Sequence, residues 1–420
     1  MSFQDINYSR RSFVRVGLSS LLGLAGLPLL SQVQANDQSQ RRIKNCIFLY
    51  MNGGPSHIDT FDPKPNSLAG GDFKSIKTAV KELNICEHLP QLAEQASHLT
   101  VIRSMSSREG NHNRARYLVH TGYSPQGSMK HPGLGSIIAS NFEDIDYDLP
   151  HYITIGFPSY GGGALGANYD PFFIRNPSEP ISNLIPPSNI GGLRFNHRLS
   201  LLGWTDQQFI KKYGKTGSDH KEVYQQALKL MNSPLTSTFD LENEPKSVRE
   251  AYGHNSFGQG CLMARRMIES GVKFIEVSLN GWDTHTDNFT ETRNLMDQLD
   301  PAFAMLVKDL SQRDKLDETL IIWMGEFGRT PRINRNDGRD HHPQAWSAVL
   351  AGGGIRSGQV IGRTDQDGHH VISKPTPLPD LFATISSILG IDPTDEYFTP
   401  DGRPVALVDK GIPIREIQNR

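Results

Sequence analysis

Six short apolar runs, none of which alternates between apolar and polar residues, constrain the fold of this chain more than any other feature. Strands that are buried on both faces, as in a parallel sheet covered by helices, have this pattern. Stretches with helical periodicity lie between the runs, and this alternation predicts an α/β fold with a doubly wound, mostly parallel sheet and helices on both faces. The expected strands are 46–51, 99–102, 152–155, 274–279, 320–324 and 348–350, and the expected helices are 114–120, 222–231, 258–270, 291–313 and 379–389.

The first 35 residues predict a separate segment. Arg10 and Arg11 precede an uncharged apolar run over 16–30, and small residues end at Ala35. Such a run has the length of a signal peptide and is too short to span a bilayer, and the arginine pair is typical of a twin-arginine signal. We therefore expect the twin-arginine translocase as an export partner, cleavage after Ala35, a periplasmic or secreted protein, and no stable membrane span after cleavage. An uncleaved anchor or an ordinary amphipathic helix is the alternative.

The rest of the chain, residues 36–420, is expected to form a single α/β domain with an inserted subregion at about 170–250, where Pro, Asn and Ser are frequent. The formal net charge of −2 gives no broad attraction to nucleic acid. The three cysteines lack the spacing of metal ligands, so we do not expect thiols to carry the chemistry.

Polar residues with ligand chemistry follow the first two expected strands, and ligands of doubly wound sheets bind at the carboxyl ends of strands. Asn52 and a double glycine follow the first strand, with His57 and Asp59 as additional candidate ligands. A Gly-Pro turn with exposed polar residues explains that segment equally well. After the second strand, a helix that begins near His112 would direct free N–H groups at an anion, with Arg116 one turn along. A basic loop with an Asn cap is the alternative.

The later strand ends carry carboxylates and histidines. Asp283 and His285 lie two residues apart after 274–279, so in an extended chain both can reach one cation. Glu326 follows 320–324 between glycines, and the alternative is a turn in which it pairs with a nearby arginine. The segment 338–343 adds three candidates, Asp340, His341 and His342, unless it is only a surface turn.

Adjacent histidines point apart, so usually only one of them binds a given ion. Together the strand ends predict a metal-assisted active site. Ligands that are only nitrogen and oxygen suit Zn, Mn, Fe or Ca, and we expect a divalent metal ion of this group as the cofactor, with one ion or two.

Several long motifs resemble the bacterial family known as domain of unknown function 1501. These motifs are GGPSHIDTFDPKP, GWDTHTDNF, GEFGRTPRIN, GRDHHP and LAGGGIRSGQVIGRTD, in this order over nearly the whole chain after the signal. That family resembles the alkaline phosphatase and sulfatase superfamily, whose members share a doubly wound sheet and usually hold two metal ions at strand ends.

The superfamily resemblance implies roles for single residues and also reveals departures. The first metal-binding Asp corresponds to Asn52, a poorer ligand, and the nucleophile corresponds to His112 rather than to Ser, Thr or Cys. Arg116 matches the arginine of sulfatases four residues further on. The remaining correspondences are Asp283 and His285 for a later Asp and His, Glu326-Phe327-Gly328 for Asp-His-Gly, and His341 or His342 for a final His.

Residues and resemblance together favour a metal-dependent hydrolase of sulfate or phosphate esters. We expect an anionic ester substrate, of which a sulfated polysaccharide is one candidate, held by Arg116 and the helix N-terminus. His112 would then be a metal ligand, a general acid or base, or a nucleophile. The alternative is a non-catalytic descendant of the fold that binds a polysaccharide or an envelope partner.

Overall fold

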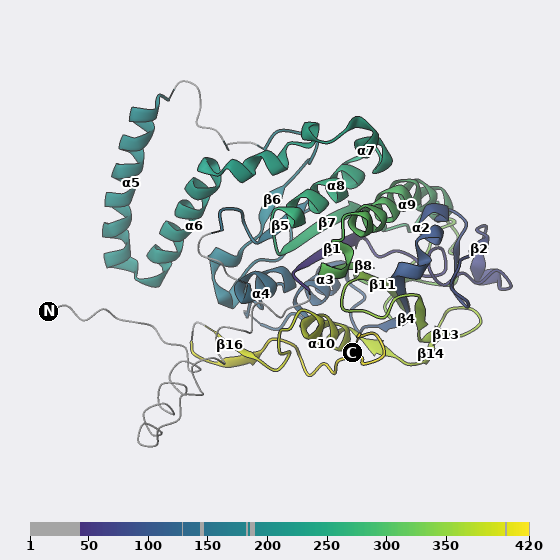
Figure 1. Cartoon of the computed structure of the whole chain (residues 1–420). Coiled ribbons are helices and arrows are strands. Elements are labelled where there is room, and N and C mark those ends of the chain that lie inside the picture. Colours follow the sequence, from purple (N-terminus) through teal and green to yellow (C-terminus); the bar gives the residue numbers. More distant parts are fainter. Residues whose placement is uncertain are drawn as a thin grey trace, which may run out of the picture. The chain divides into compact units, whose positions relative to one another are not determined.

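The computed structural model describes residues 43–127, 129–142, 147–181, 184, 190–399 and 401–419, without the side chains of 215–220 (Figure 1). The predicted export signal, residues 1–35, and its cut site lie outside the described residues. Within the described part of the chain, no helix has both the length and the apolar character that crossing a membrane requires.

A nine-stranded sheet lies at the centre of the fold, in the order β12-β4-β11-β8-β1-β7-β5-β6, with β15 paired to β4. Every pair is parallel except the two made by β11, which runs antiparallel to both β4 and β8. The strands of this sheet are β1 (Asn45–Asn52), β4 (Leu99–Ser106), β5 (Tyr152–Ile155), β6 (Phe172–Ile174), β7 (Phe274–Asn280), β8 (Thr319–Gly325), β11 (Trp346–Gly352), β12 (Gln359–Ile361) and β15 (Thr376–Pro377). The predicted doubly wound, mostly parallel sheet is confirmed, and the run at 348–350 proves to be its antiparallel member.

Helices cover both faces of the sheet, as predicted. One hydrophobic core lies under α8 (Ser256–Glu269) and α9 (Asn288–Gln312), and α2 (Pro90–Glu94) packs against α9 on the same side. The other core lies under α3 (His112–Thr121), α4 (Leu134–Asn141) and α10 (Leu378–Ile388) (Figure 1). Side chains of β1 alternate between the two cores: Ile47 and Leu49 enter the first, and Phe48 and Tyr50 enter the second. Because both faces are apolar, the sequence of this strand shows no alternation.

Four two-stranded pairs lie outside the main sheet. They are β2 (Ser75–Lys77) with β3 (Asn84–Cys86), β9 (Gly328–Arg329) with β10 (His341–His342), β13 (Arg363–Thr364) with β14 (Val371–Ser373), and β16 (Glu396–Phe398) with β17 (Pro404–Ala406). The pair of β9 and β10 matters for the site, because it brings the segment after β8 against the His341–His342 segment.

The subregion expected at 170–250 contains α5 (Gly192–Tyr213), α6 (Lys215–Asn232) and α7 (Lys246–Ala251). The sequence predicted only part of α6, and α5 was not predicted. The N-cap of α5 is Gly191, which offers no side chain to the free N–H groups of the first turn, so the sequence carries no start signal for this helix. Inserted helices do not by themselves define a domain, and the division of the chain stays a prediction.

Candidate metal centre

The candidate site lies where three neighbouring parallel strands end. Strands β7, β1 and β8 are adjacent in register, with Asn52 opposite Asn280 and Met51 opposite Gly325. Asp283 follows the end of β7 by three residues, and Glu326 follows β8 directly. Parallel strands that end in register place the segments after them at one edge of the sheet. His112, the first residue of α3, and His341, in β10, approach the same edge from two other elements.

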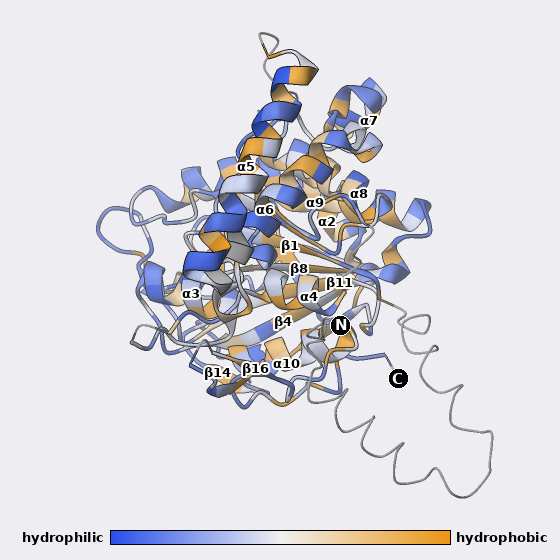
Figure 2. Cartoon of the chain, turned by 90° about the vertical axis from the view of Figure 1, so that its left-hand side faces the viewer, coloured by the Kyte–Doolittle hydropathy of each residue, from blue (hydrophilic) through white to orange (hydrophobic). Residues whose placement is uncertain are grey.

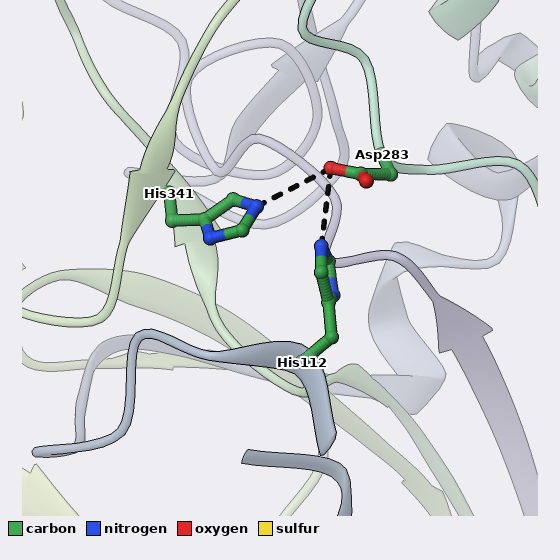
Figure 3. A group of neighbouring side chains, drawn as sticks. All are labelled: His112, Asp283 and His341. Carbon is green, nitrogen blue, oxygen red and sulfur yellow. Dashed lines mark hydrogen bonds and ion pairs between the residues drawn. The ribbon is translucent and has the colours of Figure 1, made fainter. Parts of the chain in front are cut away.

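Three side chains gather closely enough there to share one ion (Figure 3). The ligand atoms of His112, Asp283 and His341 all lie within 4.8 Å of one another. Asp283 Oδ1 lies 3.2 Å from His112 Nε2 and 3.4 Å from His341 Nε2. The Nε2 atom of His285 joins them, 3.1 Å from Asp283 Oδ1 and 3.0 Å from His341 Nε2. We call these four residues the Asp283 cluster.

The separations among His112, Asp283 and His341 suit ligands of one ion, whereas His285 lies outside this group of three and contacts two of its members. Ligand atoms that lie 2.0–2.1 Å from a tetrahedral ion are about 3.3 Å from one another, close to the distances in the Asp283 cluster. Two imidazoles with one carboxylate are typical ligands of zinc and of iron, whereas calcium prefers ligands that are all oxygen. The donor set therefore fits a transition metal better than calcium.

Each histidine of the cluster uses its other ring nitrogen to donate a hydrogen bond. His112 Nδ1 donates to Glu326 Oε1 at 2.7 Å, His285 Nδ1 donates to Asp340 Oδ1 at 2.8 Å, and His341 Nδ1 donates to the Gly110 carbonyl at 2.8 Å. Carbonyl and carboxylate oxygens only accept hydrogen bonds, so each Nδ1 carries a proton. In its neutral form, each ring therefore presents a lone pair at Nε2.

With these tautomers, three Nε2 lone pairs gather around Asp283 Oδ1, and the donor that contacts this oxygen is Arg329 Nη2, at 2.6 Å. The buried Nε2 of His112 makes no hydrogen bond. Arg329 offsets the charge of Asp283, but the Nε2 lone pairs of the three rings still repel one another unless protons or a further cation lie between them. The residues present thus fit a bound metal ion.

Glu326 contacts the Nδ1 side of His112, the side of this ring that is turned away from Asp283. Its carboxylate is completely buried and accepts hydrogen bonds from Tyr50 Oη at 2.9 Å and from Gly53 N at 3.1 Å, besides the one from His112. Burial lowers the pKa of His112, but the hydrogen bond to Glu326 and the negative charges of Glu326 and Asp283 together outweigh burial, so the net shift of this pKa is upward. The carboxylate that the sequence predicted as a ligand lies on the Nδ1 side of His112, where its hydrogen bond fixes the orientation of that ring.

Asp283 is held as an anion by Arg329, a residue that the sequence analysis did not assign to the site. Arg329 is fully buried, and its Nη2 donates to Asp283 Oδ1 at 2.6 Å while its Nε donates to the Gly54 carbonyl at 3.0 Å. Burial raises the pKa of Asp283, but the hydrogen bond and the charge of Arg329, together with the nearby His112 and His285, overcome that effect and lower this pKa to about 2. The alternative for Glu326 was a turn in which it pairs with a nearby arginine. In the structure Arg329 pairs with Asp283, and Glu326 pairs with His112.

Arg116 carries a positive charge that no carboxylate of the described residues neutralises by an ion pair. Its Nη2 donates to Asn52 Oδ1 at 2.8 Å, and Asn52 in turn donates to Asn280 Oδ1 at 2.8 Å. Its guanidinium lies 4.8 Å from the ring centre of Phe157. An unneutralised guanidinium beside two amides, one helical turn after His112, is suited to binding an anion.

The N-terminus of α3 is less free than the sequence suggested. Asn111 is the N-cap, and its side chain accepts hydrogen bonds from the backbone N–H groups of Asn113 and Arg114. Because these are two of the amides that would otherwise face a ligand, an anion at this edge depends on Arg116 more than on the helix terminus.

The remaining candidate residues have other partners. His57 is buried and donates from Nε2 to the Gly368 carbonyl at 2.9 Å, and His342 donates from Nε2 to the His369 carbonyl at 2.8 Å. Asp59 forms a completely buried ion pair with Arg339, with the closest atoms 2.8 Å apart. Asp340 lies beside the cluster as the partner of His285, and this hydrogen bond lowers the pKa of the Asp340 carboxyl.

Residues 43–418 match the family described as "Protein of unknown function (DUF1501)", which confirms the predicted family. No curated protein matches the chain.

Matching solved structures include a sulfatase and an alkaline phosphatase. The sulfatase PsFucS1 from Pseudoalteromonas sp. is 15% identical to this chain. The matched region covers 92% of this chain and 72% of the sulfatase, with a TM-score of 0.38. A mutant of TAB5 alkaline phosphatase with bound Mg is 14% identical, with 83% and 99% covered and a TM-score of 0.41. Ps i-CgsB in complex with a neocarrahexaose is 12% identical, with 83% and 72% covered and a TM-score of 0.41. At these scores the likeness is distant, and no functional conclusion rests on it.

Proposed function

This chain belongs to the DUF1501 family, and we propose that it is an exported, metal-dependent hydrolase of sulfate or phosphate esters. The observation that carries the proposal is the convergence of three Nε2 lone pairs on Asp283 Oδ1, each ring held by a hydrogen-bond acceptor at Nδ1. Metal sites are typically built in this way, with outer partners that fix the tautomer of each ligand histidine. A cluster at the strand ends of a doubly wound sheet also lies where such folds bind their ligands.

The Asp283 cluster would hold the ion, and when bound the ion would supply Lewis-acid activation of the ester and of the attacking water. Glu326, Asp340 and the Gly110 carbonyl keep the three rings directed inward. Nδ1 of His112 is held by Glu326, and its Nε2 lies 3.2 Å from Asp283 Oδ1 and is directed into the cluster, which favours a ligand role for this residue over that of a nucleophile.

Arg116 would bind the charged ester group. Among the described residues its guanidinium has no carboxylate partner, and the amide groups of Asn52 and Asn280 extend the polar surface beside it. In hydrolysis, water adds to sulfur or phosphorus, the bond to the alcohol oxygen breaks, and the alcohol leaves with a proton. Negative charge on the remaining oxygens is then stabilised by the guanidinium.

The proposal also places the protein outside the cytoplasmic membrane, after passage through the twin-arginine translocase, with a sulfated polysaccharide as the first substrate class to test. A cluster open to solvent suits a polymer, since the Asp283 side chain is 47% exposed and the His285 side chain is 42% exposed.

Metal analysis of the purified chain, followed by assays with an aryl sulfate and an aryl phosphate, tests the proposal. We expect about one ion per chain and turnover of at least one ester, both lost in Asp283→Ala. Asp297→Ala is the control, because this exposed carboxylate lies in the middle of α9, away from the cluster. Absence of both metal and turnover in the unchanged chain would refute the hydrolase.

One observation supports a second candidate function, a non-catalytic protein that binds a polysaccharide or an envelope partner. The residue at the start of α3 is His112, so the chain has no hydroxyl or thiol at the position that resembles the superfamily's nucleophile. Stoichiometric metal without turnover of either ester, combined with binding of a sulfated polysaccharide, would favour this candidate.

A further inference from the structure

Helix α5 exposes an unusual amount of apolar surface. Among the twelve large apolar side chains that the described residues expose, five lie on this 22-residue helix: Leu193, Leu201, Trp204, Phe209 and Tyr213. Single exposed apolar residues are ordinary, but a concentration on one element marks a surface that binds something.

The position of α5 explains the exposure. The helix packs along α6 and, among the described elements, has no comparable contact with the sheet or with its covering helices (Figure 1). Phe195, Leu199 and Leu202 are less exposed and recur at helical spacing, so they mark the covered side. The opposite side faces solvent over the whole length of the helix, and apolar and polar residues are mixed along it (Figure 2).

The open side combines apolar and cationic side chains. At 3.6 residues per turn, Leu193, Leu201 and Trp204 fall within about 80° of one another around the helix axis. They are 80%, 63% and 61% exposed. Arginines and lysines share this side, within about 140° on the same projection: Arg194, Arg198, Lys211 and Lys212, all exposed.

The helix is therefore strongly basic in an acidic chain. The helix contains four cations and a single acidic residue, Asp206, which is buried. Helix α5 therefore carries a net charge of +3, while the whole chain carries −2. A cationic side that also presents Leu and Trp is typical of helices that lie in the interface of a membrane with anionic lipids.

Two other occupants explain less of this surface. An anionic polysaccharide would pair with the arginines and lysines but would leave Leu193 and Leu201 in water. A second copy of the chain in a two-fold interface would bring like charges of the two α5 helices together. An anionic bilayer accepts both kinds of side chain, since headgroups pair with the cations and acyl chains receive the apolar groups.

We propose that α5 is a membrane-surface helix, which docks the protein on bilayers rich in anionic phospholipid. Leu193, Leu201 and Trp204 insert at the level of the headgroups, and Arg194, Arg198, Lys211 and Lys212 bind lipid phosphates. The proposal does not depend on the metal or on hydrolysis.

The chain contains a built-in reporter of this contact. It has four tryptophans, and three of them, Trp282, Trp323 and Trp346, are at most 1% exposed, whereas Trp204 is 61% exposed. A change of tryptophan emission on addition of vesicles therefore reports chiefly on α5. The test uses the chain from Asn36, because the apolar run at 16–30 would bind vesicles itself and the compact unit 42–420 is retained.

With vesicles of phosphatidylglycerol, we expect a blue shift of emission and co-sedimentation of the chain. Both should weaken strongly with vesicles of phosphatidylcholine alone and in 1 M salt, because screening shortens the reach of the cations. Leu201→Ser should lower the partition coefficient about 10-fold or more, in line with the loss of one buried large apolar side chain. Lys211→Glu with Lys212→Glu should lower it at least as far.

Ile412→Ser is the matched control, because Ile412 is 71% exposed but lies outside α5. It should leave partitioning unchanged, and all variants should keep their metal content. Equal binding by the Leu201 variant, or no emission change with phosphatidylglycerol vesicles, overturns the proposal. So does an emission change caused by a sulfated polysaccharide without vesicles, or by concentration-dependent dimerisation seen in light scattering.

Discussion

Two histidine groups meet at adjacent residues of β10, and they have opposite characters. His341 belongs to the Asp283 cluster, whereas His342 faces a second group with His57, whose ring stacks on it at 6.3 Å, and His369, at 6.2 Å. In the first group each Nδ1 donates to an acceptor and each Nε2 is directed to a shared carboxylate oxygen. In the second group, Nε2 of His57 and of His342 donates to a backbone carbonyl.

The difference shows that residue type alone does not create a group of side chains that could hold a metal ion. Burial lowers the pKa of His57 to about 4 and lowers the pKa of His342, so these rings stay neutral and serve as hydrogen-bond donors that fix loops. In the Asp283 cluster the carbonyl and carboxylate partners occupy the opposite nitrogen. What distinguishes the two groups is which ring nitrogen the surrounding chain leaves free.

The largest effect should come from substituting His341 and His342 separately, since these neighbours in β10 belong to different groups. His341→Gln should weaken metal binding more than about 100-fold, because it removes a ligand and not only an outer partner. His342→Gln should leave metal binding unchanged within a few-fold. Metal titration of both purified variants measures this contrast, and equal losses would show that the two groups form one site.

A pH dependence of stability should separate the second group from the first. The His57 ring takes up a proton near pH 4 in the folded chain, against an ordinary pKa of 6.5. Between these values the unfolded chain binds the proton more readily, so the free energy of unfolding falls as the pH drops from 6.5 to 4, by about 3 kcal/mol in total. Urea unfolding at several pH values should show this slope in the unchanged chain.

His57→Gln is the comparison for that slope, because glutamine keeps a donor for the Gly368 carbonyl and does not titrate. The variant should lose most of the dependence between pH 4 and 6.5. A slope that persists at full size would assign it to other groups.

The smallest effect on metal affinity should come from substituting the carboxylates that border the two histidine groups, Asp340 and Asp365. Asp340→Asn removes the anionic acceptor of His285 Nδ1 and should weaken metal binding 10- to 100-fold. Asp365→Asn is its counterpart, because Asp365 accepts hydrogen bonds from the backbone amides of His369 and His370. We expect no change of metal affinity there. If Asp365→Asn weakens the metal as much as Asp340→Asn does, the two groups are coupled.

Much of the fold followed from local patterns. The strand at 46–51 was predicted almost to its ends, since β1 covers Asn45–Asn52 and both of its faces are apolar. The direction of β11 was not predictable, because an apolar strand buried on both faces looks the same in either orientation. Helix α5 was missed because a glycine N-cap gives no start signal and much of its apolar surface is not buried.

The roles at the site divide in a similar way. The sequence brought Asp283, His285 and His341 into view as candidates at strand ends, but it left His341 and His342 equivalent. It also treated Glu326 as a ligand, and it did not assign Arg329, whose buried guanidinium fixes Asp283. These roles depend on contacts between residues far apart in the chain, such as the 214 positions between His112 and Glu326.

The sequence by itself determined the family, the doubly wound class of the sheet and the strand ends that carry ligand-type side chains, because hydrophobic periodicity and motif order are local properties. Only the tertiary structure decided which nitrogen of each histidine is free, which carboxylate faces inward and which helix remains uncovered. A hydrogen-bond partner or a covering surface comes from distant parts of the chain, and no local pattern specifies it.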